Sequence, residues 1–207
     1  MDNVITRGPR DYVDIPWKIE EDWIVADIGP GTYPFYRADS FIDHDLDVIE
    51  RVTFQRPDLG FHLVELAEGL PGIADNHFDY VWCSHVLEHV DDPLACARAI
   101  SRVGKRGTLV LPSAIKESIF NFEEREHKWL ILPHPSLGIP MFIGYNIPFM
   151  QQIKDIRVQQ STCRLFRTGS GHECSEVNIL REWFAAKEKY LDVVYHWEGE
   201  LEIMVIE

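Results

Sequence analysis

The sequence SHVLEHV, residues 84–90, gathers the side chains best suited to chemistry. His85, Glu88 and His89 place two imidazoles and a carboxylate within one short stretch. Imidazole has an ordinary pKa near neutrality and can exchange a proton there, and all three side chains are common metal ligands. The same letters spell HxxEH, in which two histidines on one helical face hold zinc and the glutamate is the base of a metallopeptidase. The stretch therefore predicts a proton-transfer site or, as an alternative, a metal site.

The residues on either side of this stretch indicate a corner between a strand and a helix. The preceding sequence, FDYVW from Phe78 to Trp82, is mostly apolar, as in a strand that is buried on both faces. Asp92–Pro93 then supplies an N-cap and a first-turn proline for a helix that runs to Val103. Ligands of open α/β sheets bind at the carboxyl ends of the strands. We therefore expect residues 84–90 to line a binding site rather than a peptidase helix, and we predict no bound metal.

Further strands and helices alternate along the chain. The predicted strands are residues 23–28, 40–43, 61–66 and 108–111, and the predicted helices are residues 45–54 and 92–103. This alternation is typical of an α/β fold with a Rossmann-like, doubly wound, mostly parallel sheet. Two further apolar runs, residues 191–197 and 200–206, flank the turn Glu198–Gly199 and predict an antiparallel C-terminal hairpin.

We expect one domain over residues 1–207, with two irregular segments. Residues 1–22 form an N-terminal arm that Trp17 anchors. Residues 115–176, rich in proline and aromatic residues, form a substrate-facing insertion after the fifth strand, and a helix is predicted at residues 178–190. Between the first two strands, too few residues remain for a full helix.

Composition excludes several classes of function. The net charge of −14 and the isoelectric point near 5.0 disfavour a nucleic-acid partner, which requires a basic surface. Charges interrupt the first 22 residues, and no uncharged run approaches the length of a membrane span, so we expect no signal peptide, no membrane partner and a cytoplasmic location. The four cysteines form no CxxC pair, which predicts reduced and mostly buried thiols.

Four stretches together resemble the class I S-adenosylmethionine-dependent methyltransferases. They are VADIGPG at residues 25–31, the acid-ended strand at Asp43, the sequence LPG…NHFDYVWCSHVLEHVDDP at residues 70–93, and RVGKRGTLVLP at residues 102–112. The resemblance covers about residues 23–113 and the C-terminal tail. It implies that S-adenosylmethionine is the cofactor and S-adenosylhomocysteine the product.

The resemblance also implies where the cofactor binds. The glycine turn would lie against its methionine and ribose, Asp27 would engage its amino group, Asp43 would accept both ribose hydroxyls, and Ser84 and His85 would lie beside the sulfonium. The full set of cofactor-binding residues implied is Asp27, Gly29, Pro30, Gly31, Asp43, Leu66, Ala67, Ser84 and His85. Tyr33 stands where the family usually has a third glycine, which implies a missing or stunted first helix.

Transfer to an alcohol also needs a base, and His85 and His127 are the candidates. The shortened glycine region is similar to methyltransferases of polysaccharide assembly, which implies a small-molecule or glycan acceptor and O-methylation of a sugar. Some members of the class hold a divalent metal with an ExxEH cluster, and here His85 replaces the first acid. The alternative function is a catalytically degenerate methyltransferase fold that serves as a binding or scaffold partner.

Overall fold

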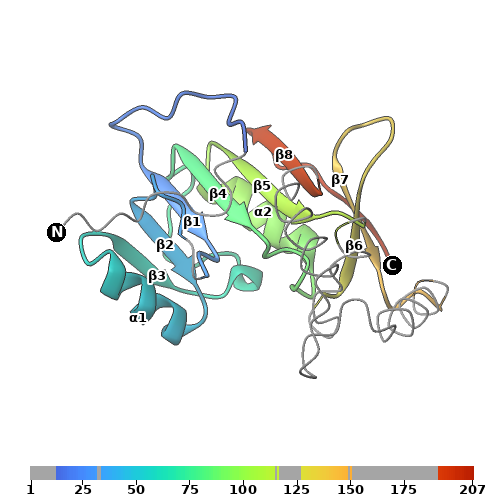
Figure 1. The fold of residues 1–207 in the computed structure, drawn as a ribbon, viewed down its shortest axis with the longest axis horizontal. Coiled ribbons are helices and arrows are strands. Elements are labelled where there is room, and N and C mark those ends of the chain that lie inside the picture. Colours follow the sequence, from blue (N-terminus) through green and yellow to red (C-terminus); the bar gives the residue numbers. More distant parts are fainter. Residues whose placement is uncertain (1–12, 32–33, 115, 117–126, 149, 151–190) are drawn as a thin grey trace, which may run out of the picture.

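The computed structural model describes residues 13–31, 34–114, 116, 127–148, 150 and 191–207 of the chain (Figure 1). Its central element is a six-stranded sheet with the order β3-β2-β1-β4-β5-β8. The strands of this sheet are β1 (Val25–Ile28), β2 (Ser40–Asp43), β3 (Gly60–Leu63), β4 (Tyr80–Ser84), β5 (Arg106–Pro112) and β8 (Asp192–Glu198). The first five strands are parallel, and β8 pairs antiparallel with β5. The predicted Rossmann-like fold class is confirmed.

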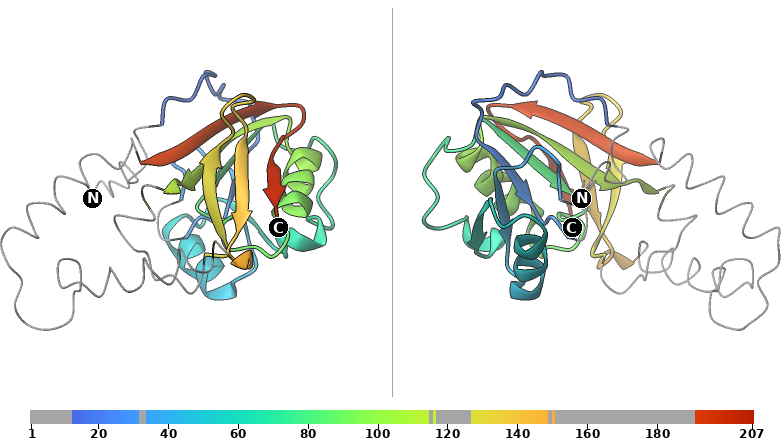
Figure 2. Two further views of the ribbon diagram at one scale, coloured as in Figure 1. Left: turned by 90° about the vertical axis from the view of Figure 1, so that its right-hand side faces the viewer. Right: turned by 60° about the vertical axis from the view of Figure 1, so that its left-hand side comes forward.

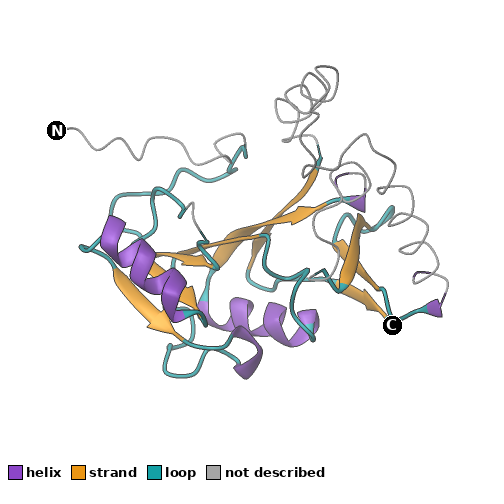
Figure 3. Ribbon diagram, turned by 60° about the horizontal axis from the view of Figure 1, so that its bottom comes forward, coloured by secondary structure: helices purple, strands orange, loops and turns teal. Residues whose placement is uncertain are grey.

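Helices cover both faces of this sheet, as a doubly wound fold requires. The helix α2 (Pro93–Val103) packs its buried side chains against Ala26 and Val81 on one face. The helix α1 (Leu46–Gln55) packs Ile49 and Val52 against the other face. The two helices and the short 3-10 helix η1 (Leu66–Glu68) are drawn in purple in Figure 3. Apolar residues alternate between the two faces of β1, β4 and β5, so each face of the sheet has its own core.

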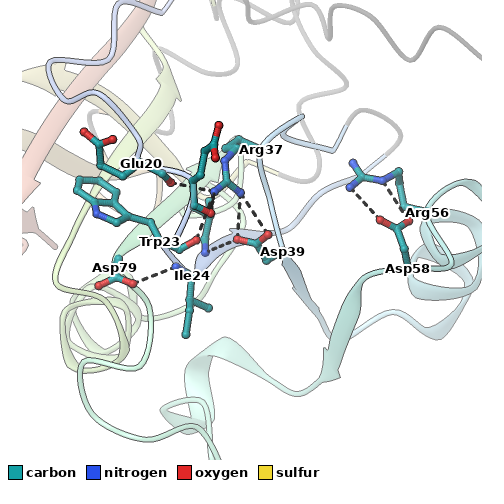
Figure 4. Close-up of polar contacts among 10 residues, drawn as sticks. Glu20, Trp23, Ile24, Arg37, Asp39, Arg56, Asp58 and Asp79 are labelled. Carbon is teal, nitrogen blue, oxygen red and sulfur yellow. Dashed lines mark hydrogen bonds and ion pairs between the residues drawn. The ribbon is translucent and has the colours of Figure 1, made fainter.

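The connection between β1 and β2 contains no helix in its described parts, residues 29–31 and 34–39. Arg37 holds this connection instead (Figure 4). Its guanidinium donates to the backbone oxygens of Glu20 and Glu21, each at 2.9 Å, and pairs with Asp39 at 3.2 Å. Asp39 in turn accepts a hydrogen bond of 2.9 Å from the N–H of Val25, at the start of β1. The prediction of a missing or stunted first helix is thus confirmed for these residues. Arg37 holds the connection in place instead.

A second, three-stranded sheet lies beside the first and has the order β6-β7-β9 (Figure 2). Its strands are β6 (Trp129–Pro133), β7 (Pro140–Gly144) and β9 (Met204–Ile206). The prediction of an irregular insertion is wrong for these residues, because β6 and β7 form an antiparallel hairpin. The prolines that suggested irregular structure, Pro133 and Pro140, face each other at the end of the ladder, where a missing N–H is tolerated.

The C-terminal segment keeps the predicted antiparallel strand, β8, but not the predicted hairpin. The N–H of Gly199 donates to the oxygen of Lys105 at 2.9 Å, and the N–H of Leu201 donates to the Ser101 hydroxyl at 2.7 Å. These bonds hold the chain against the end of α2 after β8, and β9 then pairs parallel with β7 instead of returning along β8. The predicted helix at residues 178–190 lies outside the described residues.

The remaining expectations concern the arm, the thiols and the membrane. Trp17 lies edge-on to the rings of Tyr80 and His196, at centroid distances of 6.1 and 6.0 Å, and so anchors the described part of the arm. Cys83 and Cys96 are buried free thiols, as predicted. Within the described residues, no helix combines the length and the apolar character needed to span a membrane. One core cluster includes residues of both sheets, and the single-domain organisation stays a prediction.

Candidate cofactor and catalytic site

The predicted cofactor-binding residues meet at the carboxyl edge of the parallel strands. Ile28 pairs with Ile42 of β2 and with Cys83 of β4. Ile28 is the last residue of β1, and its two partners are the next-to-last residues of β2 and β4. The residues that follow, Gly29, Asp43 and Ser84, therefore lie next to one another at the end of the sheet. This edge is the ligand-binding edge of open parallel sheets.

The turn after β1, residues 27–31, is called the β1 corner here, and its two glycines have different physical roles. Both have positive φ, +67° at Gly29 and +55° at Gly31, a region that other residues rarely adopt. A Cβ at Gly29 would lie 2.3 Å from Cγ2 of Val86, whereas a Cβ at Gly31 would meet nothing within 4 Å. Gly29 therefore permits close packing against the segment after β4, and Gly31 leaves open space at the edge. Pro30 between them is buried.

Asp27 is almost fully buried, and its carboxylate accepts a hydrogen bond of 2.6 Å from the N–H of Phe35. This bond holds Phe35, and with it the connection between β1 and β2, in place. Asp27 therefore has a structural role that does not depend on a ligand. The Phe35 ring stacks on Trp82 at a centroid distance of 4.7 Å. Tyr33, the departure from the usual glycine pattern, lies outside the described residues.

Asp43 ends β2 and has a largely buried side chain, 10% exposed. Its Oδ1 accepts a hydrogen bond of 2.9 Å from the N–H of Asp45, the N-cap of α1. Its backbone oxygen accepts from the N–H of Val64 at 3.0 Å, which ties the end of β2 to the segment after β3. The side chain is therefore fixed at the strand end, as an acceptor of ribose hydroxyls would need to be.

Leu66 and Ala67 lie in η1, the next element after β3, with Leu66 buried and Ala67 exposed. Arg102 of α2 holds the following loop by donating to the oxygens of Gly69 and Leu70, both at 2.9 Å, and of Ile73 at 2.7 Å. The role of this arginine could not be predicted from local sequence, because its partners lie about thirty residues earlier.

Residues 84–90, called the β4 corner from here on, form a turn and not a helix. Ser84 is buried at the end of β4. His85 has a positive φ of +57°, and its N–H donates to the oxygen of Val110 in β5 at 2.8 Å. Two histidines on one helical face, which the HxxEH peptidase site needs, are therefore not present here. The metallopeptidase alternative is wrong.

A buried cluster of charged side chains surrounds His85. Its Nδ1 lies 3.2 Å from Oε1 of Glu88, and its Nε2 lies 3.4 Å from Oδ1 of Asp192. Lys116 pairs with the same Asp192 oxygen at 2.8 Å, and the side chains of Lys116 and Asp192 are 1% and 0% exposed. Sequence reasoning missed Lys116 and Asp192, because they come from the segment after β5 and from the start of β8.

The cluster stabilises charged forms of its members. Burial alone would lower the pKa of His85, but the neighbouring carboxylates of Asp192 and Glu88 outweigh it and raise this pKa. Burial alone would raise the pKa values of Glu88 and Asp192, yet the His85 partner lowers both. Both ring nitrogens of His85 are engaged, Nδ1 by Glu88 and Nε2 by Asp192. This arrangement suits a positioning role, and the assignment of His85 as a base stays a prediction.

The second predicted base, His127, also reaches the β4 corner. The N–H of Lys128 donates to the backbone oxygen of Glu88 at 2.8 Å and brings the segment before β6 to this corner. The buried ring of His127 lies edge-on to that of His89, with a centroid distance of 4.6 Å. The structure therefore gathers His127, Glu88 and His89 in one place.

Parts of this chain are similar to known proteins. Residues 41–111 match a family model described as a methyltransferase domain. The uncharacterized protein MJ0638 of Methanocaldococcus jannaschii is 31% identical over 146 residues, which are 65% of this chain and 62% of that protein. The chain thus spans less than two thirds of the curated relative that it matches.

Solved structures with a similar fold include a protein from Bacillus halodurans described as a methyltransferase. It has a TM-score of 0.44 and 15% identity, and the match covers 53% of this chain and 56% of that one. An S-adenosylmethionine-dependent methyltransferase from Aquifex aeolicus has a TM-score of 0.36 and 14% identity, with coverage of 44% and 57%.

The sheet order defines a Rossmann-like α/β fold. The family-model match shows that residues 41–111 are similar to a methyltransferase domain, in agreement with the predicted resemblance over this stretch.

Proposed function

We propose that this protein is an S-adenosylmethionine-dependent methyltransferase that binds its cofactor along the carboxyl edge of β1, β2 and β4. The observation that carries the proposal is the register of these strands, which sets Gly29, Asp43 and Ser84 at one level. The open space beside Gly31 supports it, because a Cβ there would meet no heavy atom of the described residues within 4 Å, its chain neighbours aside. The match to a methyltransferase-domain model over residues 41–111, which include most of β2 and all of β4, supports it further.

Each binding residue has a physical task in this proposal. Asp43 accepts hydrogen bonds from the two ribose hydroxyls, and the backbone of Gly29, Pro30 and Gly31 lies against the ribose and methionine parts. Asp27 orients the amino group, from a carboxylate that already holds Phe35 in place. The two residues of η1, Leu66 and Ala67, pack against adenine, and Ser84 and His85 lie beside the sulfonium.

When bound, S-adenosylmethionine supplies an electrophilic methyl group on a sulfonium. The task of the chain is to align an acceptor with that methyl group and to take a proton from an alcohol. The candidates for the proton transfer are His85 and His127. His127 is the better placed of the two for this role, because both nitrogens of His85 are already engaged by Glu88 and Asp192.

For the acceptor, we propose a small molecule or a glycan that is methylated on oxygen, in the cytoplasm. The net charge of −14 argues against a nucleic-acid acceptor. The residues that face this acceptor belong to the predicted insertion, of which β6 and β7 are part.

The second candidate function is a methyltransferase fold without catalysis that serves as a scaffold. The structural role of Asp27 favours this candidate, since the carboxylate is partly used by the protein itself. Thermal denaturation with and without millimolar S-adenosylmethionine or S-adenosylhomocysteine separates the two functions. A ligand that binds only the folded chain raises the melting temperature, so the methyltransferase proposal expects a rise of several degrees. No shift with either compound would leave the scaffold function as the better account.

A further inference from the structure

Three side chains with metal-binding chemistry converge at the β4 corner from two distant segments. Ligand atoms of Glu88, His89 and His127 all lie within 4.8 Å of one another. We propose that these three residues form a binding site for a divalent transition-metal ion. This site differs from the ExxEH alternative seen in the sequence, because His85 pairs with Asp192 and His127 takes its place.

Several contacts fix the geometry of this site. Besides the bond between Lys128 and the backbone of Glu88, the indole Nε1 of Trp129 donates to the oxygen of Val90 at 2.8 Å. Nζ of Lys128 also pairs with Asp91 at 2.6 Å. These bonds fasten Lys128 and Trp129, the two residues that follow His127, to the β4 corner. They hold the C-terminal side of the histidine in place.

The Glu88 carboxylate provides a second, independent observation. The side chain is completely buried, and neither carboxylate oxygen makes a hydrogen bond to any described residue. The closest charged partner is Nδ1 of His85 at 3.2 Å from Oε1, an ion pair without hydrogen-bond geometry. A buried carboxylate is costly unless its oxygens are paired or coordinate a metal. A cation beside Glu88 would satisfy this requirement for Oε2, which accepts no hydrogen bond from a described residue, whereas Oε1 lies near His85 and His89.

The donor set indicates which ion the site would take. Two imidazoles and one carboxylate suit Zn²⁺, Mn²⁺ or Fe²⁺ better than Mg²⁺ or Ca²⁺, which prefer oxygen ligands. Metal–ligand bonds of about 2.0–2.2 Å place neighbouring ligand atoms roughly 3–4 Å apart, so small side-chain rotations close the observed cluster around an ion. Three protein ligands leave coordination positions open.

These open positions deepen the proposed function, on which this step rests. The ion would lie next to His85, beside the place assigned to the sulfonium. In this site His127 would be a ligand and not the base, and an acceptor hydroxyl bound to the ion would lose its proton to water more easily, because a metal ion lowers the pKa of a bound oxygen acid. The substrate class would then be compounds with one hydroxyl, or two adjacent ones, able to bind the metal.

Metal binding by the untagged full-length chain tests the site without reference to activity. The probes are Zn²⁺, Mn²⁺ and Mg²⁺ in equilibrium dialysis, and Co²⁺ followed by its visible absorption. We expect one equivalent of Zn²⁺ or Mn²⁺, weak Mg²⁺ binding, and a Co²⁺ band. The variants Glu88→Gln, His89→Ala and His127→Ala should each bind Zn²⁺ at least tenfold more weakly. The matched control is His77→Ala, an exposed histidine before β4 at the opposite edge of the sheet, which should bind like the wild type.

Failure of this site is distinguishable from failure of the proposed function. Less than one equivalent in the wild type, or unchanged affinity in His89→Ala, would overturn the metal site. His89 decides this point because its side chain is 37% exposed, so its removal should leave the fold intact, as circular dichroism can check. S-adenosylhomocysteine binding, measured on the same proteins without metal, should persist in His89→Ala. If the wild type bound Zn²⁺ but not S-adenosylhomocysteine, the proposed function would be contradicted and the metal site would stand.

Discussion

The β1 corner and the β4 corner stand side by side at one edge of the sheet, but they are built in different ways. The β1 corner depends on backbone space, with a glycine pressed against Val86 and an aspartate bonded eight residues away to Phe35. The β4 corner depends on charge. His85 lies next to Lys116, 31 residues later, and Lys116 pairs with Asp192, a further 76 residues on.

The difference teaches which substitutions each corner tolerates. A corner made of backbone space should be sensitive to added volume and indifferent to charge. A corner made of buried charges should be sensitive to the loss of any one partner, because the remaining charge is left without compensation in a medium of low dielectric constant.

The largest expected effect is at the β4 corner. Asp192→Asn removes the carboxylate that pairs with the buried Lys116 and His85. Breaking a buried pair in this way costs about 3–5 kcal/mol, so we expect a loss of this size in the free energy of unfolding, measured with urea. Asp58→Asn is the matched control, since Asp58 pairs with Arg56 at the surface and is 64% exposed. Equal stability of the two variants would mean that the buried cluster does not hold this corner together.

The next effect is at the β1 corner. Gly29→Ala places a Cβ into Val86 and also occupies a positive φ, which together should cost about 2–4 kcal/mol of unfolding free energy. Gly31→Ala has the same backbone strain without the contact, and should cost only about 1–2 kcal/mol.

The double variant Gly29→Ala, Val86→Ala isolates the contact between the two corners. Removing the Val86 methyl groups should return part of the stability lost in Gly29→Ala, as chemical denaturation of the single and double variants would reveal. If the two substitutions simply add, the close approach of the two corners is not what requires the glycine.

A smaller and pH-dependent effect is expected at the opposite edge of the sheet. Asp79 accepts hydrogen bonds from Lys105 at 2.6 Å and from the N–H of Ile24 at 2.9 Å, and these partners lower its pKa. Because the folded pKa is below the unfolded value of 3.8, the stabilisation is present above about pH 4 and is lost as the pH falls through the folded pKa. The melting temperature of Asp79→Asn should therefore lie below that of the wild type at pH 6, and the gap should close near pH 3. A gap that is independent of pH would show that the Asp79 charge does not contribute.

The strands and helices that could be predicted from the sequence have local causes. The strand β2, Ser40–Asp43, has the predicted limits, and α2 begins at Pro93 after the predicted cap Asp92. The hairpin of β6 and β7 was missed because its prolines suggested irregular structure, although they stand at strand ends. The path after β8 was mispredicted because Gly199 and Leu201 bond to Lys105 and Ser101, at the C-terminal end of α2. These partners lie about a hundred residues earlier, so no local sequence pattern indicates them.

The site divides in the same way. Hydrophobic patterns show where β1, β2 and β4 end, and Gly29, Asp43 and Ser84 lie at these ends. Their place at the carboxyl edge of the sheet could therefore be predicted from sequence. The partners of His85, and the meeting of His127 with Glu88 and His89, depend on contacts between segments far apart in the chain. Such contacts are set by tertiary packing and have no periodic signature.

The most direct test of the central claim is calorimetric titration of S-adenosylhomocysteine into the wild type and into Asp43→Asn. An amide has one acceptor oxygen where the carboxylate has two, so Asp43→Asn should keep the bond from Asp45 but hold the ribose hydroxyls poorly. We predict binding by the wild type and by the control Asp58→Asn, and at least tenfold weaker binding by Asp43→Asn. No heat of binding in the wild type, or equal affinity in all three proteins, would contradict cofactor binding at the carboxyl edge of the sheet.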